Sequence, residues 1–326
     1  MGNGGPIFII GCAGSGSGLL RLALDRHERI AIAPETGFMR IERASRFVPF
    51  WPFGGRWYRR LGLTEEQLDD HLRRFYEGLF RAYAERQGKT RWGESTPWHV
   101  WHVEAMARLF PDAVFLATVR HPAGNAVSSV RRRGLGFGAA VGEWADANAE
   151  IARRAVSLGD RFAVLRYEDL VLDPERSLRS LFAWLGEDWP EGAQWDADGL
   201  DRTRVSHWTR SVGAPRRARL ERRAGALVEL FGYSLDEPDA GDPLGLLRGG
   251  DIEARVARLP GLELATPPAV PLTERLYNPR DVQLRAVEPP PAATAPPVPP
   301  RPGWLRRVVR PVARRLPRSV RRALRG

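Results

Sequence analysis

The 326-residue sequence is poor in several residue types that would each indicate a class of protein. Cys12 is the single cysteine, which excludes an internal disulfide framework and a zinc site built from several thiolates. One cysteine is also compatible with a reducing, cytoplasmic compartment. No apolar run approaches the roughly 20 residues that a membrane span needs, and the apolar start Pro6–Ile10 is too short for a signal sequence. We therefore expect neither feature.

Positive charge is concentrated at the carboxyl end of the chain. Lys89 is the only lysine, so arginine supplies almost all of this charge. The formal net charge is +11, but residues 301–326 contain ten arginines and no acidic residue, which leaves +1 for residues 1–300. This balance argues against a nucleic-acid-binding surface on the main part of the chain. The hydrophobic fraction of 43% and the eleven tryptophans indicate a buried core.

Short apolar runs alternate with helical patterns along the chain. Such alternation predicts an α/β domain with a P-loop-type, three-layer fold, in which helices cover both faces of a mostly parallel central sheet. Thr64 with Gln67 also forms a capping-box pattern at the start of a long helix. We predict strands at Pro6–Ile10, Ile30–Ala33, Ala113–Val119 and Arg161–Tyr167, and helices at Gly18–Arg26, Thr64–Gln87, His99–Leu109, from Ala123 and at Ser177–Leu185.

Proline usage divides the chain into three parts. Fifteen of the 27 prolines fall between Pro238 and Pro302, which predicts an extended linker after the α/β domain. We assign residues 1–238 to a nucleotide-binding domain, 239–302 to a Pro-rich extension and 303–326 to an Arg-rich tail. In the tail, apolar residues recur every four positions from Trp304, which predicts a basic amphipathic helix interrupted by prolines. Such a segment suits an anionic membrane surface or an acidic partner, with a disordered solubilising tail as the alternative.

A glycine-rich loop lies between the first predicted strand and helix. Backbone N–H groups in such a loop, together with the positive end of the helix dipole, favour a phosphate. Gly11 and Gly16 have the spacing of a Walker loop, but Ser17 replaces its lysine and Gly18 replaces its magnesium-binding hydroxyl. We therefore predict an anion site without a metal. A tight strand–helix turn with no ligand is the alternative. The candidate loop residues are Gly11, Ala13, Gly14, Ser15, Gly16, Ser17 and Gly18.

A second pair of candidate residues follows the strand Ala113–Val119. Arg120 ends this strand, and Ser128 lies in the helix after it. The carboxyl ends of parallel strands share one edge of a sheet, so we expect this arginine and hydroxyl to converge on an anion near the glycine loop.

Four motifs in register resemble the sulfotransferase family that uses 3′-phosphoadenosine 5′-phosphosulfate, in particular its bacterial members and the tyrosylprotein branch. The match spans about residues 6–235. The segments that carry it are Ile9–Leu20, Leu24–His27 with Pro34–Thr36, Leu109–Ala113 through Arg120–Pro122 to Ser128, and Arg166–Leu170 with Asp173–Pro174.

The resemblance implies a role for each candidate residue and a metal-free reaction. The loop Gly11–Gly18 would hold the 5′-phosphosulfate, whereas Arg120 and Ser128 would hold the 3′-phosphate. Tyr167 would lie near the adenine or the 3′-phosphate, and Trp208 and Arg210 would close the site. Glu35 matches the acidic residue that serves as base in the tyrosylprotein branch, because transfer to a hydroxyl needs a proton acceptor. A surface carboxylate is the alternative for Glu35.

Two cations of the family pattern are missing from this sequence. Gly14 and Ser95 occupy positions where the family carries basic residues. Arg21, Arg40 and Arg91 are candidates to replace them. The leading interpretation is transfer of a sulfuryl group to a hydroxyl or amine of a carbohydrate, lipid, peptide or small metabolite. A nucleotide-binding protein with weakened or lost catalysis and a P-loop phosphotransferase are the alternatives.

Overall fold

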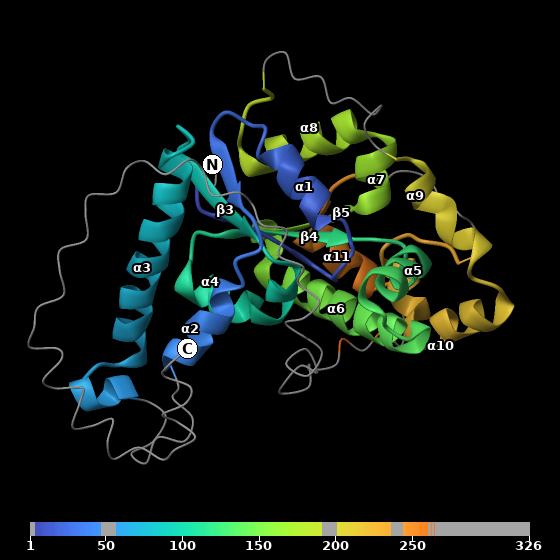
Figure 1. Cartoon of the computed structure of the whole chain (residues 1–326), viewed down its shortest axis with the longest axis horizontal. Coiled ribbons are helices and arrows are strands. Elements are labelled where there is room, and N and C mark those ends of the chain that lie inside the picture. Colours follow the sequence, from blue (N-terminus) through green and yellow to red (C-terminus); the bar gives the residue numbers. More distant parts are fainter. Residues whose placement is uncertain are drawn as a thin grey trace, which may run out of the picture. The chain divides into compact units, whose positions relative to one another are not determined.

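The computed structural model describes residues 4–46, 57–190, 201–235 and 244–259, together with Leu262 and Leu264 (Figure 1). These residues all belong to one compact unit, Met1–Leu276. Most of the predicted Pro-rich extension and the whole of the tail 303–326 lie outside the described residues. The assignment of those segments, and the membrane or acidic partner suggested for the tail, stay predictions.

A six-stranded sheet forms the centre of the unit, with the strand order β2-β3-β1-β4-β5-β6. The first five strands in this order pair in parallel, and β6 pairs antiparallel to β5 at the edge. The predicted α/β fold with a mostly parallel sheet is confirmed. The strands are β1 (Ile7–Gly11), β2 (Ile30–Ala33), β3 (Arg91–Ser95), β4 (Val114–Val119), β5 (Phe162–Arg166) and β6 (Leu247–Arg248).

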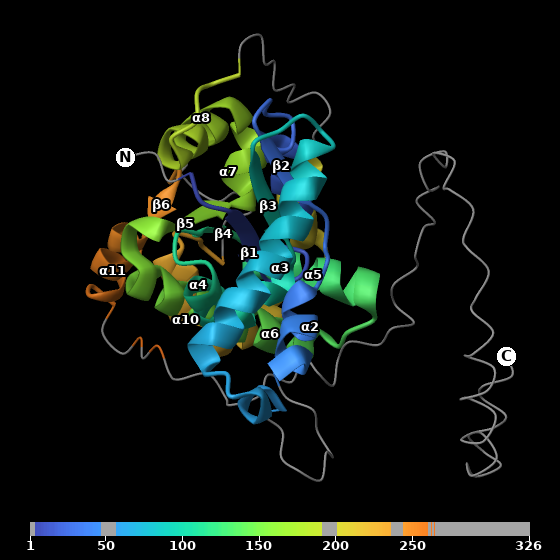
Figure 2. The same cartoon turned by 90° about the vertical axis from the view of Figure 1, so that its left-hand side faces the viewer.

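Helices cover both faces of this sheet, because successive strand residues point to opposite sides. Ile7 and Ile9 of β1 pack with α1 and α8, whereas Phe8 and Ile10 pack in the cluster that contains residues of α3, α4 and α6. Figures 1 and 2 show the two helical layers. The main helices are α1 (Ser17–Leu24), α2 (Phe38–Arg46), α3 (Glu65–Glu85), α4 (Val103–Leu109), α5 (Pro122–Arg133), α6 (Phe137–Leu158), α7 (Tyr167–Leu172), α8 (Pro174–Leu185), α9 (Thr203–Ser206), α10 (Ala214–Leu230) and α11 (Gly249–Val256).

The start of α3 agrees with its sequence signal, whereas the helix predicted before Leu109 differs from the structure. Thr64 caps α3 by accepting the Gln67 N–H, and the Gln67 side chain returns a bond to the Thr64 N–H, as the capping-box pattern predicts. The single helix predicted over His99–Leu109 is wrong. A 3-10 helix, η2 (Pro97–His102), precedes α4, because His102 leaves the helical conformation with φ −116° and ψ 6°.

The parallel arrangement places the candidate segments at one edge of the sheet. The glycine loop follows β1, the segment with Glu35 follows β2, and Thr96 follows β3. Arg120 follows β4 and Tyr167 follows β5. All five segments therefore lie at the carboxyl ends of adjacent strands, where α/β proteins of this kind bind their ligands.

Candidate functional site

The glycine loop turns sharply between β1 and α1. Gly14 and Gly16 have φ values of +86° and +100°, which residues with a side chain adopt only under strain. A Cβ on Gly16 would lie 2.4 Å from Cδ2 of Tyr167, so this backbone also passes directly beside the Tyr167 ring. Both glycines are therefore required by the path of the loop, whether or not a ligand is bound.

Buried hydrogen bonds hold the loop from the side of the sheet. The Ser15 and Thr118 hydroxyl oxygens lie 2.6 Å apart, and the Ser15 N–H donates to the Cys12 carbonyl at 3.0 Å. Asn125 of α5 donates from Nδ2 to the Ala13 carbonyl at 3.1 Å. Ser15 thus supports the loop from inside with its hydroxyl and its N–H. Burial raises the pKa of the Cys12 thiol, which keeps the thiol protonated and excludes a thiolate nucleophile here.

The beginning of α1 presents donors on the outer side of the loop. Gly16 precedes the first helical residue, Ser17, and makes no side-chain cap. The first N–H groups of a helix have no acceptor within the helix, and the helix dipole makes this end positive. The N–H groups of Ser17 and Gly18 therefore have no acceptor within the helix.

Arg120 brings a positive charge to this loop. Its guanidinium donates from Nη1 to the Gly14 carbonyl at 3.3 Å and from Nη2 to the Arg204 carbonyl at 2.9 Å. The guanidinium carbon lies 4.4 Å from the centre of the Tyr167 ring. Only 7% of Arg120 is exposed, and its Nε has no hydrogen-bond partner among the described residues. An unsatisfied buried donor on a charged group calls for an acceptor that the described protein atoms do not supply.

Ser128 of α5 lies beside Gly14, the same loop residue that Arg120 contacts. A Cβ built on Gly14 would be 3.6 Å from the Ser128 hydroxyl oxygen. Arg120 and Ser128 therefore both lie beside Gly14 of the glycine loop, and the anion on which they would converge stays a prediction. Tyr167 completes this group from the end of β5. Loss of hydration raises the pKa of its hydroxyl, and the Arg120 charge opposes that shift.

Trp208 and Arg210 differ in how they relate to the site. Trp208 is buried and stacks on the His121 ring, with ring centres 4.3 Å apart and planes 10° apart. Arg210 is exposed on the 3-10 helix η5 (His207–Arg210). His121 accepts the Ala123 N–H at Nδ1, and its Nε2 lies 2.8 Å from the Ser234 carbonyl. Burial lowers its pKa to about 4, so His121 is neutral and shapes the turn after β4.

Glu35 precedes Thr36, which belongs to a buried polar cluster that was not predicted from the sequence. The cluster centres on Glu94, whose Oε1 accepts the Thr36 N–H and hydroxyl at 2.9 Å each and the Thr96 hydroxyl at 2.5 Å. The other oxygen of Glu94 lies 3.0 Å from Nδ1 of His99, and both side chains are buried. These contacts fix the residue next to Glu35. The motif Trp92–Pro97 contained the signal, since it places a carboxylate beside two hydroxyls.

The environment of Glu35 favours a proton acceptor. Loss of hydration raises the pKa of its carboxyl, and the buried Glu94 carboxylate raises it further. Arg132, His99 and Arg21 lower it. Glu35 keeps solvent contact, so water screens these interactions. A raised pKa makes the ionised carboxylate a stronger base.

Comparison with known proteins shows the family of this chain. Residues 6–191 match the family model described as Sulfotransferase family. The chain belongs to the sulfotransferase family. The match covers more than half of the chain and contains the glycine loop, Glu35, Arg120 and Tyr167, whereas Trp208 and Arg210 lie outside it.

Two sulfotransferases of vertebrates are similar in sequence. Protein-tyrosine sulfotransferase 1 of Danio rerio is 28% identical over 193 residues, which are 56% of this chain and 53% of that protein. Protein-tyrosine sulfotransferase 2 of Gallus gallus is 28% identical over 197 residues, which are 57% of this chain and 52% of that protein. This chain therefore spans about half the length of the curated relatives that it matches.

A solved structure shares the sulfotransferase fold. The sulfotransferase domain from the Synechococcus PCC 7002 olefin synthase is 25% identical and superimposes with a TM-score of 0.52. The superposition covers 70% of this chain and 94% of that domain. The three-layer α/β architecture predicted from the sequence is thus the architecture of this family.

The two cations absent from the sulfotransferase pattern are not replaced by Arg91. Arg91 begins β3 whereas Ser95 ends it, and a strand rises about 3.3 Å per residue, so they lie about 13 Å apart along β3. Arg91 therefore lies at the amino-terminal ends of the strands, opposite the glycine loop. The prediction that Arg91 replaces a missing cation is wrong. Arg21 and Arg132 both influence the Glu35 carboxyl, and the sequence analysis had not considered Arg132. Arg40 lies on α2, exposed to solvent.

The described residues contain neither a metal-ligand cluster nor a membrane-spanning helix. No group of three or more histidine, cysteine, aspartate or glutamate side chains in this part of the chain could hold a metal ion. Among the described helices, none combines the length and the apolar composition needed to cross a membrane.

Proposed function

We propose that this protein transfers a sulfuryl group from 3′-phosphoadenosine 5′-phosphosulfate to a hydroxyl or amine of an acceptor molecule. The observation that carries the proposal is the buried Arg120 guanidinium, which contacts the glycine loop while its Nε is left without a partner among the described residues. A phosphate beside the loop supplies the acceptor that this donor needs. Membership of the sulfotransferase family supports the identity of the nucleotide.

The donor nucleotide fits the arrangement of the carboxyl edge. The N–H groups at Ser17 and Gly18 would hold the 5′-phosphosulfate, with Gly14 and Gly16 allowing its close approach. Arg120 and Ser128 would hold the 3′-phosphate. The Tyr167 ring, which already lies against Gly16 and Arg120, would border the nucleotide. Nothing in this arrangement needs a metal, because helix donors and arginine supply the positive charge. The neighbouring Gly11, Ala13 and Ser15 shape the loop, and Trp208 and Arg210 stand beside the segment that anchors Arg120.

Glu35 is the proposed base for the acceptor. As the new bond forms between the acceptor oxygen and sulfur, the bond between sulfur and the phosphate oxygen breaks, and the acceptor proton moves to the Glu35 carboxylate. The products are the sulfated acceptor and adenosine 3′,5′-bisphosphate. Glu94 acts as a positioning residue, because its bonds to Thr36 hold the neighbouring backbone and its charge strengthens Glu35 as a base.

The second candidate function is nucleotide binding with weakened catalysis. Gly14 and Ser95 favour it, because both remove a cation that would stabilise charge on the departing phosphate. One preorganised donor contributes about 2.7–4 kcal/mol to transition-state stabilisation. Arg21 and Arg132 are the basic residues placed to compensate, since both act on the Glu35 carboxyl.

One experiment separates the two functions. Transfer of labelled sulfate is measured across carbohydrate, lipid, peptide and small hydroxyl acceptors, with binding of adenosine 3′,5′-bisphosphate measured in parallel. We expect Glu35→Gln to abolish transfer while nucleotide affinity stays within a few fold, and the exposed Glu28→Gln to leave both unchanged. In the wild type, the transfer rate should fall as the pH drops through the raised pKa of Glu35, because protonation removes the base.

The results assign each part of the proposal separately. Binding without transfer to any acceptor would favour the second function. Full transfer by Glu35→Gln would remove Glu35 from the mechanism, and failure to bind adenosine 3′,5′-bisphosphate would reject the nucleotide site.

A further inference from the structure

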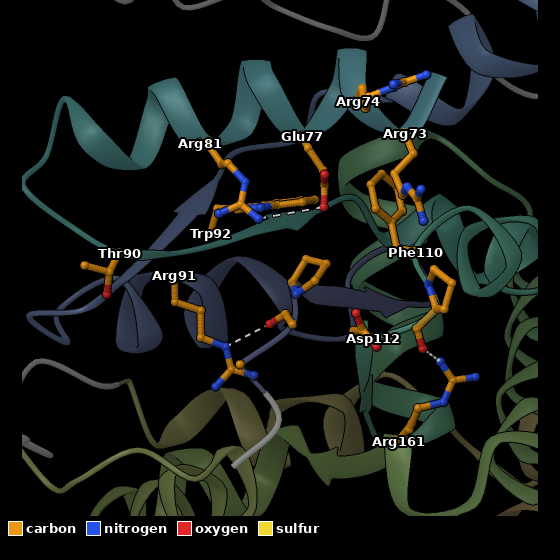
Figure 3. Close-up of a pocket in the computed structure, with 14 residues that line it drawn as sticks. Arg73, Arg74, Glu77, Arg81, Thr90, Arg91, Trp92, Phe110, Asp112 and Arg161 are labelled. Carbon is orange, nitrogen blue, oxygen red and sulfur yellow. Dashed lines mark hydrogen bonds and ion pairs between the residues drawn. The ribbon is translucent and has the colours of Figure 1, made fainter. Parts of the chain in front are cut away.

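A pocket of about 670 Å³ lies at the amino-terminal ends of the strands, away from the glycine loop. Its lining includes the residues just before four parallel strands, whereas the nucleotide-site segments follow the same strands. Gly5 precedes β1, Asp112 precedes β4, Arg161 precedes β5, and Arg91 is the first residue of β3. Helix α3 closes the pocket on one side (Figure 3). This pocket is therefore separate from the proposed nucleotide site.

Five arginines line the pocket. The lining contains two carboxylates, those of Glu77 and Asp112. Figure 3 shows Arg73 and Arg81 extending from α3 and Arg91 and Arg161 extending from the strand side. The fifth is Arg74.

Carboxylates pair with three of the five arginines. Arg73 lies 2.7 Å from Asp70, Arg81 lies 3.9 Å from Glu77, and Arg91 lies 3.0 Å from Glu187. Arg161 donates to the neutral carbonyl of Pro111, so no carboxylate offsets its charge in this contact. The pocket thus combines three ion-paired arginines with the charge of Arg161, which no carboxylate among the described residues offsets.

Arg91, which also lines the pocket, has a buried guanidinium on the α8 side of the sheet. It is 5% exposed, donates from Nε to the Gly5 carbonyl at 2.9 Å and from Nη1 to the Leu185 carbonyl at 2.8 Å. Its Nη2 has no hydrogen-bond partner among the described residues. The loss of an expected hydrogen bond on a buried charged group is unfavourable unless a ligand or water supplies the acceptor.

Two backbone segments pack closely at the floor of the pocket. A Cβ on Gly5 would lie 1.8 Å from the Asp112 carbonyl oxygen, so the segments before β1 and β4 touch through their backbones. Trp92 and Phe110 form the rest of the wall but are 3% and 2% exposed, which leaves little apolar surface for a ligand. An oxyanion matches this lining better than an apolar molecule does, because arginine forks pair with sulfate and phosphate oxygens.

We propose that this pocket binds a multiply charged oxyanion, a ligand that carries several sulfate or phosphate groups, independently of the nucleotide site. Its volume accommodates a ligand larger than one inorganic sulfate, and its arginines come from α3, β3 and the residue before β5. Such a ligand would bridge α3 to the sheet.

The test is calorimetric titration of the full chain after saturation with adenosine 3′,5′-bisphosphate. Sodium tripolyphosphate, a trisulfated disaccharide and inorganic sulfate are the three probes, so the titrations also show whether phosphate or sulfate groups are preferred. The double variant Arg73→Gln/Arg161→Gln removes two guanidinium groups from opposite walls. We expect one binding site to weaken at least tenfold in it for the preferred multivalent probe. The matched control is Arg86→Gln, an exposed arginine just after α3 that does not line the pocket.

The variants separate the pocket from other positive charge and from loss of fold. Binding to the arginines of residues 301–326 is the same in every variant, so the difference between variants reports the pocket alone. The charge-preserving pair Arg73→Lys/Arg161→Lys should retain affinity within a few fold, and circular dichroism checks that each variant is folded. Equal binding by wild type and the glutamine double variant would overturn the proposal, as would the absence of binding by all three probes. Because the nucleotide site is filled throughout, neither result depends on the proposed sulfuryl transfer.

Discussion

Replacement of Arg120 by glutamine should reduce affinity for one part of the nucleotide selectively. The side chain holds two carbonyls, those of Gly14 and Arg204, and keeps its Nε without a partner among the described residues. If that donor binds the 3′-phosphate, the variant loses one charge-assisted hydrogen bond, which contributes about 1.5–3 kcal/mol. At about 1.4 kcal/mol per factor of ten, affinity for adenosine 3′,5′-bisphosphate should fall roughly ten- to 150-fold.

Comparison of two ligands isolates this effect. Adenosine 5′-phosphate lacks the 3′-phosphate, so the Arg120→Gln variant should bind it with nearly the affinity of the wild type. Titration calorimetry of both ligands with wild type, Arg120→Gln and the exposed control Arg86→Gln gives the ratio directly. The reasoning is refuted if Arg120→Gln weakens both ligands by the same factor, because the arginine would then act by holding the glycine loop and not by binding the 3′-phosphate.

Two further predictions concern stability. Gly16→Ala should lower the free energy of unfolding in urea by about 1–3 kcal/mol, because it forces φ of +100° on a residue whose Cβ would lie 2.4 Å from the Tyr167 ring. Gly18→Ala, whose Cβ would meet open space, should stay within about 1 kcal/mol of the wild type; equal losses in the two variants would contradict this explanation. The second prediction follows from His121, whose pKa of about 4 lies below the ordinary 6.5 because the folded protein buries the neutral ring. Its contribution to stability is present above pH 6.5 and is lost as the pH falls toward about 4, by about 3 kcal/mol in total. His121→Gln should flatten the decline in unfolding free energy over that window, and an unchanged slope would show that other groups cause it.

Local patterns in the sequence were sufficient to predict the fold and the main ligand edge. Apolar runs of strand length, each followed by a helical pattern, indicate a parallel sheet without knowledge of any contact. The glycine loop and Arg120 each follow such a run, so the geometry of parallel strands brings them to one edge. The proximity of Ser128 to Gly14 follows from the same rule, since α5 begins directly after β4.

Other features could not be read from local patterns, because they depend on which strands are neighbours. The strand at Arg91–Ser95 was not predicted, and so Arg91 was assigned to the wrong edge. The Glu94 cluster joins residues after β2 to residues of β3 and η2, which are distant in sequence and meet only because β2 and β3 pair. From the sequence alone, the motif Trp92–Pro97 indicated only that Ser95 stands where the family often has a basic residue.

The sequence by itself therefore determined the α/β class, the glycine loop and the family, because periodicity, turn residues and motif order are short-range properties. Tertiary structure decided which side chains share a site. Long-range strand pairing placed Thr36, the neighbour of Glu35, on Glu94 and brought Arg91 and Arg161 to the same pocket. Hydrogen bonds between strands far apart in the chain set that order, and no local pattern of residues encodes it.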